Sequence, residues 1–473
     1  MLDFTSYSSS EKALRFFEEF SKIPRGSGNT KAIAGYLVKF ANDRGLEVIR
    51  DSADNVIIKK PATEGYEDRP GVIIQGHTDI VALKEPGCPI NMDKEGLDLY
   101  IDGEYLRARG TTLGADDGVA MAYAMAILDS DDVAHPALEA VFTSDEETGL
   151  LGATALDTSA LNGNMLINID SDEEGIFTAG CAGGGRIDIS LPVTAKTRIG
   201  RTFTLKVGGL KGGHSGVEIH KGRANAIKVI AEILSKLDGV RLGKFIAGSA
   251  DNAIPSDAIV IFHSKSSIYE ISQIINDVKE ALPEEETDAR FNVDMSLFSA
   301  KLLSTEDSAN ILSLLCEMPN GVTRMSEDIE GLVETSLNMG IIDLDDKSLS
   351  LTVSVRSAKG EEKANLINKI KEIASSHHAS VGVRGEYPAW EYRKDSHLRD
   401  VMCKVYSDMY GKDATVVTIH AGLECGIFSD KMGDLDCVSI GPDNHDIHTP
   451  DERLSLPSFN RMYEYLINVL KNL

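Results

Sequence analysis

The stretch GVIIQGHTD, residues 71–79, is an apolar run that ends in a histidine and an acid. Two further apolar runs end in a similar way: ALEAVFTSDEE (137–147) ends in three acids, and NMLINID (164–170) ends in Asp170. Short apolar runs with polar ends predict buried strands. A helix predicted at 117–129 lies between the first two of them. This alternation favours a mainly parallel α/β sheet with helices on both faces.

The acids that follow these strands are the informative feature. Ligands of open α/β sheets bind in the crevice at the carboxyl ends of the strands. Three separate strands therefore bring His77, the pair Glu146 and Glu147, and Asp170 to the same edge. The sequence predicts a polar site at this edge.

A further pair of acids, Asp116 and Asp117, lies in TTLGADDG (111–118), where a loop leads into the predicted helix. A helix N-terminus favours negative charge, but two adjacent acids exceed what a cap needs. Packing so many carboxylates together is unfavourable without compensating positive charge. Divalent cations supply that charge, and histidine with carboxylates suits Zn²⁺ or Mn²⁺ better than Ca²⁺.

Neighbouring residues offer divided roles within such a site. Residues i and i+2 of a strand share a face, so Asp79 can orient the imidazole of His77 or a nearby group. Of Glu146 and Glu147, one can bind metal while the other takes a proton from the attacking water. A later loop, GPDNHDIHTPDER (441–453), offers two more candidate ligands, which are His445 and His448.

The pattern changes after a glycine cluster at 180–185. Residues 202–296 predict a β-α-β-β-α-β order, as in an α+β domain with helices on one face. Residues 303–386 predict helix, strand, strand, helix and strand, which doubles that order apart from its first strand. We therefore predict one catalytic α/β domain, formed by 1–186 and 387–473, that is interrupted by an inserted domain at 187–386.

Composition limits the partners and the compartment. The 473 residues include 74 acids and 48 lysines and arginines, giving a net charge of −26. This charge disfavours nucleic acid and anionic membranes as partners. No apolar run reaches roughly 18 residues, and the N-terminal stretch shows no secretory signal. The six scattered cysteines form no CxxC pair, so we expect a reducing cytoplasm.

With these residues in view, the chain resembles the co-catalytic zinc peptidases related to carboxypeptidase G and aminoacylase-1. Within that family it is most similar to the subfamily of aminoacyl-histidine dipeptidases, also called cytosolic non-specific dipeptidases. The resemblance covers nearly the whole chain and rests on these motifs: SKIPRGSGN (21–29), HTD (77–79), GADDG (114–118), SDEETG (144–149), NIDSDEEG (168–175), GGLKGGHSGVEIH (208–220), DNAIP (251–255), VETSLNMG (333–340), VSVRS (353–357), HAGLECG (420–426) and HTPDE (448–452).

The resemblance implies two divalent cations per chain, as Zn²⁺ with Mn²⁺ or Co²⁺ as alternatives. It implies these metal ligands: His77 and Asp170 on one cation, Glu147 and His448 on the other, and Asp116 bridging both. Asp79 would be the aspartate beside His77, and Glu146 the general base and acid. Some relatives have Asn where this chain has Asp117, so the role of Asp117 stays open, and so does that of His445.

The resemblance also implies that the inserted domain is a lid and dimerisation domain. Its His214 would reach over the active site, sometimes from a partner subunit, and Arg356 would bind the substrate carboxylate bidentately. Weaker candidates for lining the pocket are Asn252, Ser336 and Glu424. A phosphate loop at the glycine-rich 208–216 is disfavoured, because no GxxxxGK[ST] motif is present.

The implied activity is hydrolysis of dipeptides, including Xaa-His. Two alternatives remain within enzymes: an amidohydrolase that acts on N-acyl amino acids, and a tripeptidase. From another class, a non-catalytic metal-containing binding protein would require a missing base or ligand, whereas every expected residue is present.

Overall fold

The computed structural model describes residues 2–327, 329 and 331–473, which form two compact units. Unit 1 consists of Met1–Cys181, Tyr392–Thr418 and Leu423–Leu473, and unit 2 consists of Ala182–Glu391 and Ile419–Gly422. The predicted boundaries were 186/187 and 386/387. In the structure the inserted unit is longer at both ends, because it begins at Ala182 and runs to Glu391. The short segment 419–422 also belongs to unit 2.

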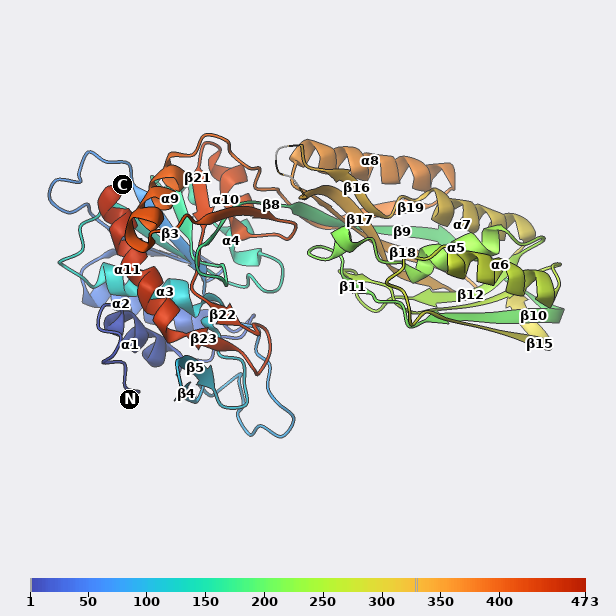
Figure 1. The fold of residues 1–473 in the computed structure, drawn as a ribbon, viewed down its shortest axis with the longest axis horizontal. Coiled ribbons are helices and arrows are strands. Elements are labelled where there is room, and N and C mark those ends of the chain that lie inside the picture. Colours follow the sequence, from blue (N-terminus) through green and yellow to red (C-terminus); the bar gives the residue numbers. More distant parts are fainter. Residues whose placement is uncertain (1, 328, 330) are drawn as a thin grey trace. The chain divides into compact units, whose positions relative to one another are not determined.

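The main sheet of unit 1 has the strand order β1-β2-β6-β3-β7-β21-β8-β20 (Figure 1). Its strands are β1 (Glu47–Arg50), β2 (Val56–Lys60), β3 (Val72–His77), β6 (Leu138–Thr143), β7 (Met165–Asn168), β8 (Ile176–Cys181), β20 (Thr415–Ile419) and β21 (Asp436–Ser439). The central neighbours β6, β3, β7 and β21 run parallel, whereas β1, β2 and β8 pair antiparallel. Every residue of β3 is buried, as its unbroken apolar run predicts for a central strand.

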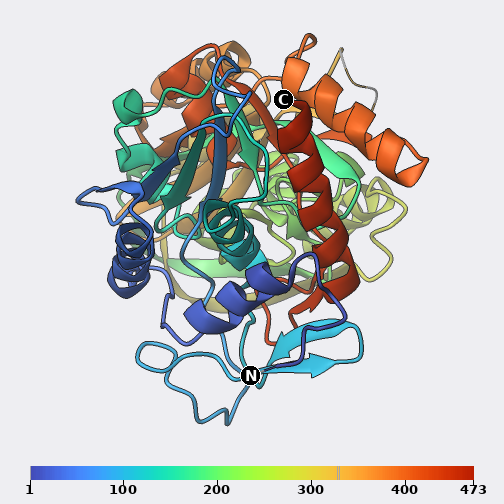
Figure 2. The same cartoon turned by 90° about the vertical axis from the view of Figure 1, so that its left-hand side faces the viewer.

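Helices cover both faces of this sheet. They are α1 (Glu11–Phe20), α2 (Lys31–Asp43), α3 (Ala115–Leu128), α4 (Leu151–Ala155), α9 (His397–Tyr410), α10 (Glu424–Met432) and α11 (Leu456–Asn472). Val438 of β21 lies in the core with α9 and α11, which are side by side in orange and red in Figure 2. The preceding side chain in the strand, Cys437, points the other way and contacts Ser429 of α10. The predicted fold class is therefore confirmed.

A small sheet of order β22-β23-β5-β4 joins the C-terminal loop to the first part of the chain. Its strands are β4 (Leu99–Asp102), β5 (Tyr105–Ala108), β22 (Asn444–His445) and β23 (Arg453–Ser455). β23 pairs with β5, so Leu454 lies opposite Leu106. β23 also pairs with β22, and this second pairing joins the two ends of the loop that carries His448.

Unit 2 contains a largely antiparallel sheet of order β15-β10-β14-β12-β17-β18-β9-β19. Its strands are β9 (Gly183–Pro192), β10 (Lys196–Gly208), β12 (Arg241–Ala247), β14 (Ala258–His263), β15 (Arg290–Leu302), β17 (Val333–Leu344), β18 (Ser348–Ser357) and β19 (Ser380–Tyr387), and β16 (Gly321–Met325) pairs with β17. Its helices are α5 (Ala226–Ser235), α6 (Ile268–Glu280), α7 (Thr305–Glu317) and α8 (Gly360–Ser376). All four lie on one side of this sheet in Figure 1.

The predicted doubling is visible in the strand order. The first half runs β10-α5-β12-β14-α6-β15, and its strands lie in the spatial order fourth, first, third, second. The second half consists of β9, α7, β17, β18, α8 and β19, with β9 as its first strand. Its strands have the same spatial arrangement, read from the opposite end of the sheet. The sequence prediction gave that half no first strand, because β9 precedes the whole first half in the chain.

Neither disulfide bonds nor membrane-spanning helices occur among the described residues. All six cysteines are free thiols, as their scattered positions suggested. In the part of the chain that the structure describes, no helix combines the length and the apolar character needed to cross a bilayer.

Candidate metal centre

The carboxyl ends of β3, β6 and β7 meet at one edge of the unit 1 sheet, because these strands are parallel neighbours. β3 ends at His77 itself. Glu146 and Glu147 follow the end of β6 by a short loop, and Asp170 lies two residues beyond the end of β7. The residues that the sequence placed at this edge are therefore brought together.

Asp116 lies between two histidines from opposite ends of the chain. Its Oδ1 is 3.0 Å from Nε2 of His77, and its Oδ2 is 3.0 Å from Nε2 of His448. The same nitrogen of His77 is 3.8 Å from Oδ1 of Asp170, and that of His448 is 2.9 Å from Oε1 of Glu147. The two oxygens of one carboxylate thus face two different clusters.

Each cluster has the composition of a cation site. In one, His77, Asp116 and Asp170 offer ligand atoms that all lie within 4.8 Å of one another. In the other, Asp116, Glu147 and His448 do the same. One nitrogen with carboxylate oxygens is a donor set that suits Zn²⁺ or Mn²⁺. The residues present therefore fit a pair of divalent cations that share Asp116.

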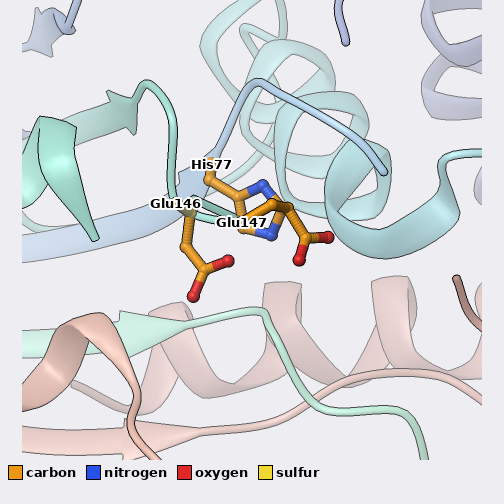
Figure 3. A group of neighbouring side chains, drawn as sticks. All are labelled: His77, Glu146 and Glu147. Carbon is orange, nitrogen blue, oxygen red and sulfur yellow. The ribbon is translucent and has the colours of Figure 1, made fainter. Parts of the chain in front are cut away.

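Glu146 and Glu147 form a third group with His77, shown in Figure 3. The two carboxylates leave the loop in different directions, and that of Glu147 lies on the side of the imidazole ring. Burial and the charges of Glu424 and Glu147 raise the pKa of Glu146 to about 8. A carboxyl group whose pKa lies near neutrality can both accept and return a proton.

Asp79 connects His77 to the glutamate loop. The backbone oxygen of Asp79 lies 3.0 Å from Nδ1 of His77, which leaves Nε2 directed toward Asp116. Its carboxylate accepts hydrogen bonds from the backbone N–H groups of Glu146 and Glu147 at 3.0 and 3.3 Å. Burial opposes its ionisation, but hydrogen bonds from His77 and Ser27 outweigh that effect, and the pKa of Asp79 is lowered. Asp79 therefore orients two parts of the centre.

The local charge balance favours a bound cation. Burial and the nearby Asp116 and Asp117 raise the pKa of Asp170 well above its usual value. Hydrogen bonds to Asp116 and Glu147 raise the pKa of His448 to about 10. These raised pKa values mean that bound protons reduce the repulsion between the carboxylates. A divalent cation at the same place would neutralise that negative charge more effectively.

The two residues with open roles lie in different places. Asp117 is buried and points away from the clusters, because its carboxylate accepts the backbone N–H groups of His77 and Ala120 at 3.1 and 3.2 Å. His445 lies in β22, and its ring contacts Tyr105 edge-on. Neither residue belongs to a candidate ligand group among the described residues.

Glu424, predicted to line the pocket, is completely buried within unit 1. Its Oε2 accepts hydrogen bonds from Nε2 of Gln75 and Oγ1 of Thr143, both at 2.6 Å. Gln75 in turn accepts from Asn168 at 2.7 Å. Glu424 thus belongs to a polar network beneath the strand ends, and burial raises its pKa to about 7.

The other four substrate-binding candidates all lie in unit 2. Ser336 and Arg356 are paired across β17 and β18, and Nη1 of Arg356 donates to the hydroxyl of Tyr387 at 3.1 Å. His214 lies in β11 (Gly213–His214), which pairs with β13 (Ala253–Ile254) next to Asn252. The backbone oxygen of Asn252 accepts from Ser215 at 2.8 Å.

The sequence did not single out His420 as a site residue, although it begins the motif HAGLECG. Its Nε2 lies 2.7 Å from Oγ of Ser336, and the residue is 7% exposed. A Cβ atom on Gly216 would lie 2.7 Å from the oxygen of His420, 2.9 Å from Cε1 of His214 and 3.2 Å from Nε of Arg356. These three residues therefore gather around Gly216, where only glycine fits.

Comparison with known proteins agrees with this geometry. The sequence profile of peptidase family M20/M25/M40 matches residues 73–472. The chain is 35% identical to the cytosol non-specific dipeptidase of Escherichia coli K12, over 97% of this chain and 96% of that protein. The chain belongs to this family and is therefore a peptidase.

Solved structures show the same relationship. The crystal structure of aminoacylhistidine dipeptidase from Vibrio alginolyticus superposes with a TM-score of 0.91 at 35% identity, covering 98% of this chain and 96% of that one. The aminopeptidase PepT of Bacillus cereus superposes with a TM-score of 0.58 at 17% identity over 98% of both chains, which shows a shared fold.

Proposed function

We propose that this chain hydrolyses dipeptides by means of two divalent cations held at the metal centre. One observation carries the proposal: the carboxylate of Asp116 lies 3.0 Å from Nε2 of both His77 and His448. This geometry suits a bridging ligand. The substrate class is supported by the two dipeptidases that are 35% identical over nearly the whole length.

When bound, the cations would polarise the peptide carbonyl and make a water molecule more acidic. The chain supplies the proton transfers. Glu146 takes a proton from the attacking water and gives it to the leaving amine, since one carboxyl group can act first as base and then as acid. Asp79 fixes the position of the Glu146 loop and the orientation of the His77 ring through its hydrogen bonds.

The proposed resident metal is Zn²⁺, with Mn²⁺ and Co²⁺ as alternatives, because these metals share a preference for mixed nitrogen and oxygen ligands. The relative from Escherichia coli is named for the cytosol, and we propose the cytoplasm for this chain as well. Three expectations stay predictions. Arg356 would bind the substrate carboxylate, His214 would reach over the active site, and unit 2 would mediate dimerisation.

Metal removal and a substrate panel test the proposal. The purified chain is treated with a chelator, dialysed, and reloaded with Zn²⁺, Mn²⁺ or Co²⁺. Activity is then measured on Xaa-His dipeptides, other dipeptides, tripeptides and N-acetyl amino acids. We expect dipeptide hydrolysis that is lost on chelation and restored by metal. Preference for N-acetyl amino acids or tripeptides would favour the related amidohydrolase or tripeptidase, and no turnover with bound metal would favour a binding protein.

A further inference from the structure

Glu452, the last residue of the HTPDE motif, holds the turn that leads into Asp116. Its carboxylate accepts the backbone N–H groups of Leu113, Gly114 and Ala115 at 2.8, 2.9 and 2.9 Å. The N–H of Asp116 lies 3.4 Å from the same group. Glu452 is 2% exposed and follows His448 by four residues, so one short segment supplies both a candidate ligand and this contact.

Arg25 holds the same turn from the opposite direction. Its Nη2 donates to the carbonyl oxygen of Gly114 at 2.5 Å, and its Nη1 donates to the carbonyl oxygen of Thr78 at 2.9 Å. Thr78 lies between His77 and Asp79. A single guanidinium, 1% exposed, therefore joins the histidine loop to the Asp116 turn.

The turn itself has no room to relax. Gly114 has a φ of +69°, a conformation that favours glycine. A Cβ atom there would lie 2.7 Å from Cγ2 of Ile80 and 2.9 Å from Nη2 of Arg25. Its N–H is bound by Glu452 and its carbonyl oxygen by Arg25, so both sides of the residue are fixed.

Part of the role of these two side chains is structural, because an apolar residue in place of either would leave buried backbone N–H or carbonyl groups unpaired. Both charged groups are nevertheless costly to desolvate. Glu452 also adds negative charge beside Asp116, where carboxylates are already crowded. Burial lowers the pKa of Arg25 to about 10, and the charges of Glu452, Asp79 and Asp117 oppose that effect. The guanidinium thus remains a cation within the acidic centre.

We infer that Arg25 and Glu452 act as a pair of positioning residues, which fix the Asp116 carboxylate relative to His77 and His448 at the spacing that two cations require. This inference rests on the proposed function, because it concerns the geometry of the metal centre. Neither residue is directed at substrate. Both act through the backbone of residues 113–116, and Arg25 also acts through Thr78.

The test compares Glu452→Gln and Arg25→Lys with Glu139→Gln. Glu139 is a matched control, because its buried carboxylate accepts the N–H groups of Asn162 and Gly163 at 2.9 to 3.1 Å. It lies at the start of β6, at the opposite end of that strand from the loop that carries Glu146 and Glu147. Each full-length variant is loaded with Co²⁺, and its visible absorption spectrum reports the coordination geometry. Metal affinity is measured by competition with a chelator, and thermal unfolding is followed with and without metal.

For Glu452→Gln and Arg25→Lys we expect an altered Co²⁺ spectrum and metal binding weakened about 10- to 100-fold, the usual effect of losing a residue that orients metal ligands. We expect kcat to fall with little change in KM. In Glu139→Gln the metal-free protein should lose comparable thermal stability, while spectrum, affinity and kcat stay at wild-type values.

Two results would overturn the inference. One is a wild-type spectrum and wild-type affinity in either positioning variant. The other is an equal loss of affinity in Glu139→Gln, which would show a general effect of destabilisation. If Glu452→Gln does not fold, Arg25→Lys decides, since it keeps the positive charge and loses the fork of two donors. If the wild-type chain itself binds no metal, both this inference and the proposed function fail; if wild type binds metal and the variants match it, only this inference fails.

Discussion

The Nε2 atom of His448 lies 3.0 Å from Oδ2 of Asp116, although 332 positions separate the two residues in the chain. The other oxygen of the same carboxylate is 3.0 Å from His77. The two clusters thus share Asp116. Their other residues come from the carboxyl ends of parallel strands and, in the case of His448, from the loop between β22 and β23.

The first prediction concerns Asp116 itself. In Asp116→Asn, one shared anionic ligand is lost from both clusters, so we expect bound metal to fall well below two equivalents per chain and dipeptidase activity to be lost. Metal analysis after gel filtration measures this. Asp436→Asn is the control, because Asp436 is also buried in unit 1 but serves Ser396 and Leu398. Two tightly held equivalents in Asp116→Asn would contradict the bridging assignment.

A second prediction separates Glu146 from the ligands. Glu146→Gln keeps the size of the side chain but cannot accept the proton, so kcat should fall by about 10²- to 10⁴-fold. Metal content and KM should stay near wild type. The exposed Glu173 offers a control in Glu173→Gln. Near-normal turnover by Glu146→Gln would remove Glu146 as the general base.

Metal affinity should rise with pH. In the metal-free chain the pKa of His448 is raised to about 10 and that of Asp170 is raised well above its usual value. A cation must displace these protons, so affinity should increase by up to about tenfold per pH unit for each displaced proton. Chelator competition between about pH 6 and pH 8 measures the slope. A flat profile would mean that these groups are already deprotonated or do not bind metal.

A fourth prediction concerns stability in acid. Burial and the nearby Arg356 lower the pKa of His420 to about 4, whereas an unfolded histidine titrates near 6.5. Between these values the unfolded chain binds a proton that the folded chain does not. The free energy of unfolding should therefore fall by about 3 kcal/mol as the pH drops from about 6.5 to about 4.

The comparison for that prediction is His420→Gln, which can still hydrogen-bond Ser336 but does not titrate. Denaturant unfolding of both proteins at several pH values isolates the contribution of His420. Above about pH 6.5 the difference between the two should be constant. Parallel curves down to pH 4 would show that His420 is solvated.

The predicted carboxylate contact of Arg356 can be tested through the substrate. In Arg356→Met, loss of a hydrogen bond to a charged group should lower kcat/KM for dipeptides by about 10- to 100-fold. A dipeptide amide lacks the carboxylate, so wild type and variant should treat it alike. The control is Arg384→Met, which removes a surface arginine paired with Asp188. An equal loss on the amide would contradict carboxylate binding.

The sequence by itself determined the fold class and the edge at which the acids gather. The carboxyl ends of neighbouring parallel strands meet at one edge, so apolar runs that end in His77 and Asp170 needed no tertiary information to be placed together. The helix predicted at 117–129 was also placed closely, since α3 spans Ala115–Leu128 and a long apolar run is a local property.

Tertiary structure alone decided the remainder, because those features depend on contacts between distant segments. Asp116 and Asp117 are adjacent acids, and only the path of the backbone directs one toward His448 and the other toward the N–H of His77. β9 becomes the first strand of the second half of unit 2 through pairing with β18, more than 150 residues later. Arg25 and Glu452 meet at Gly114 through hydrogen bonds that no local pattern encodes.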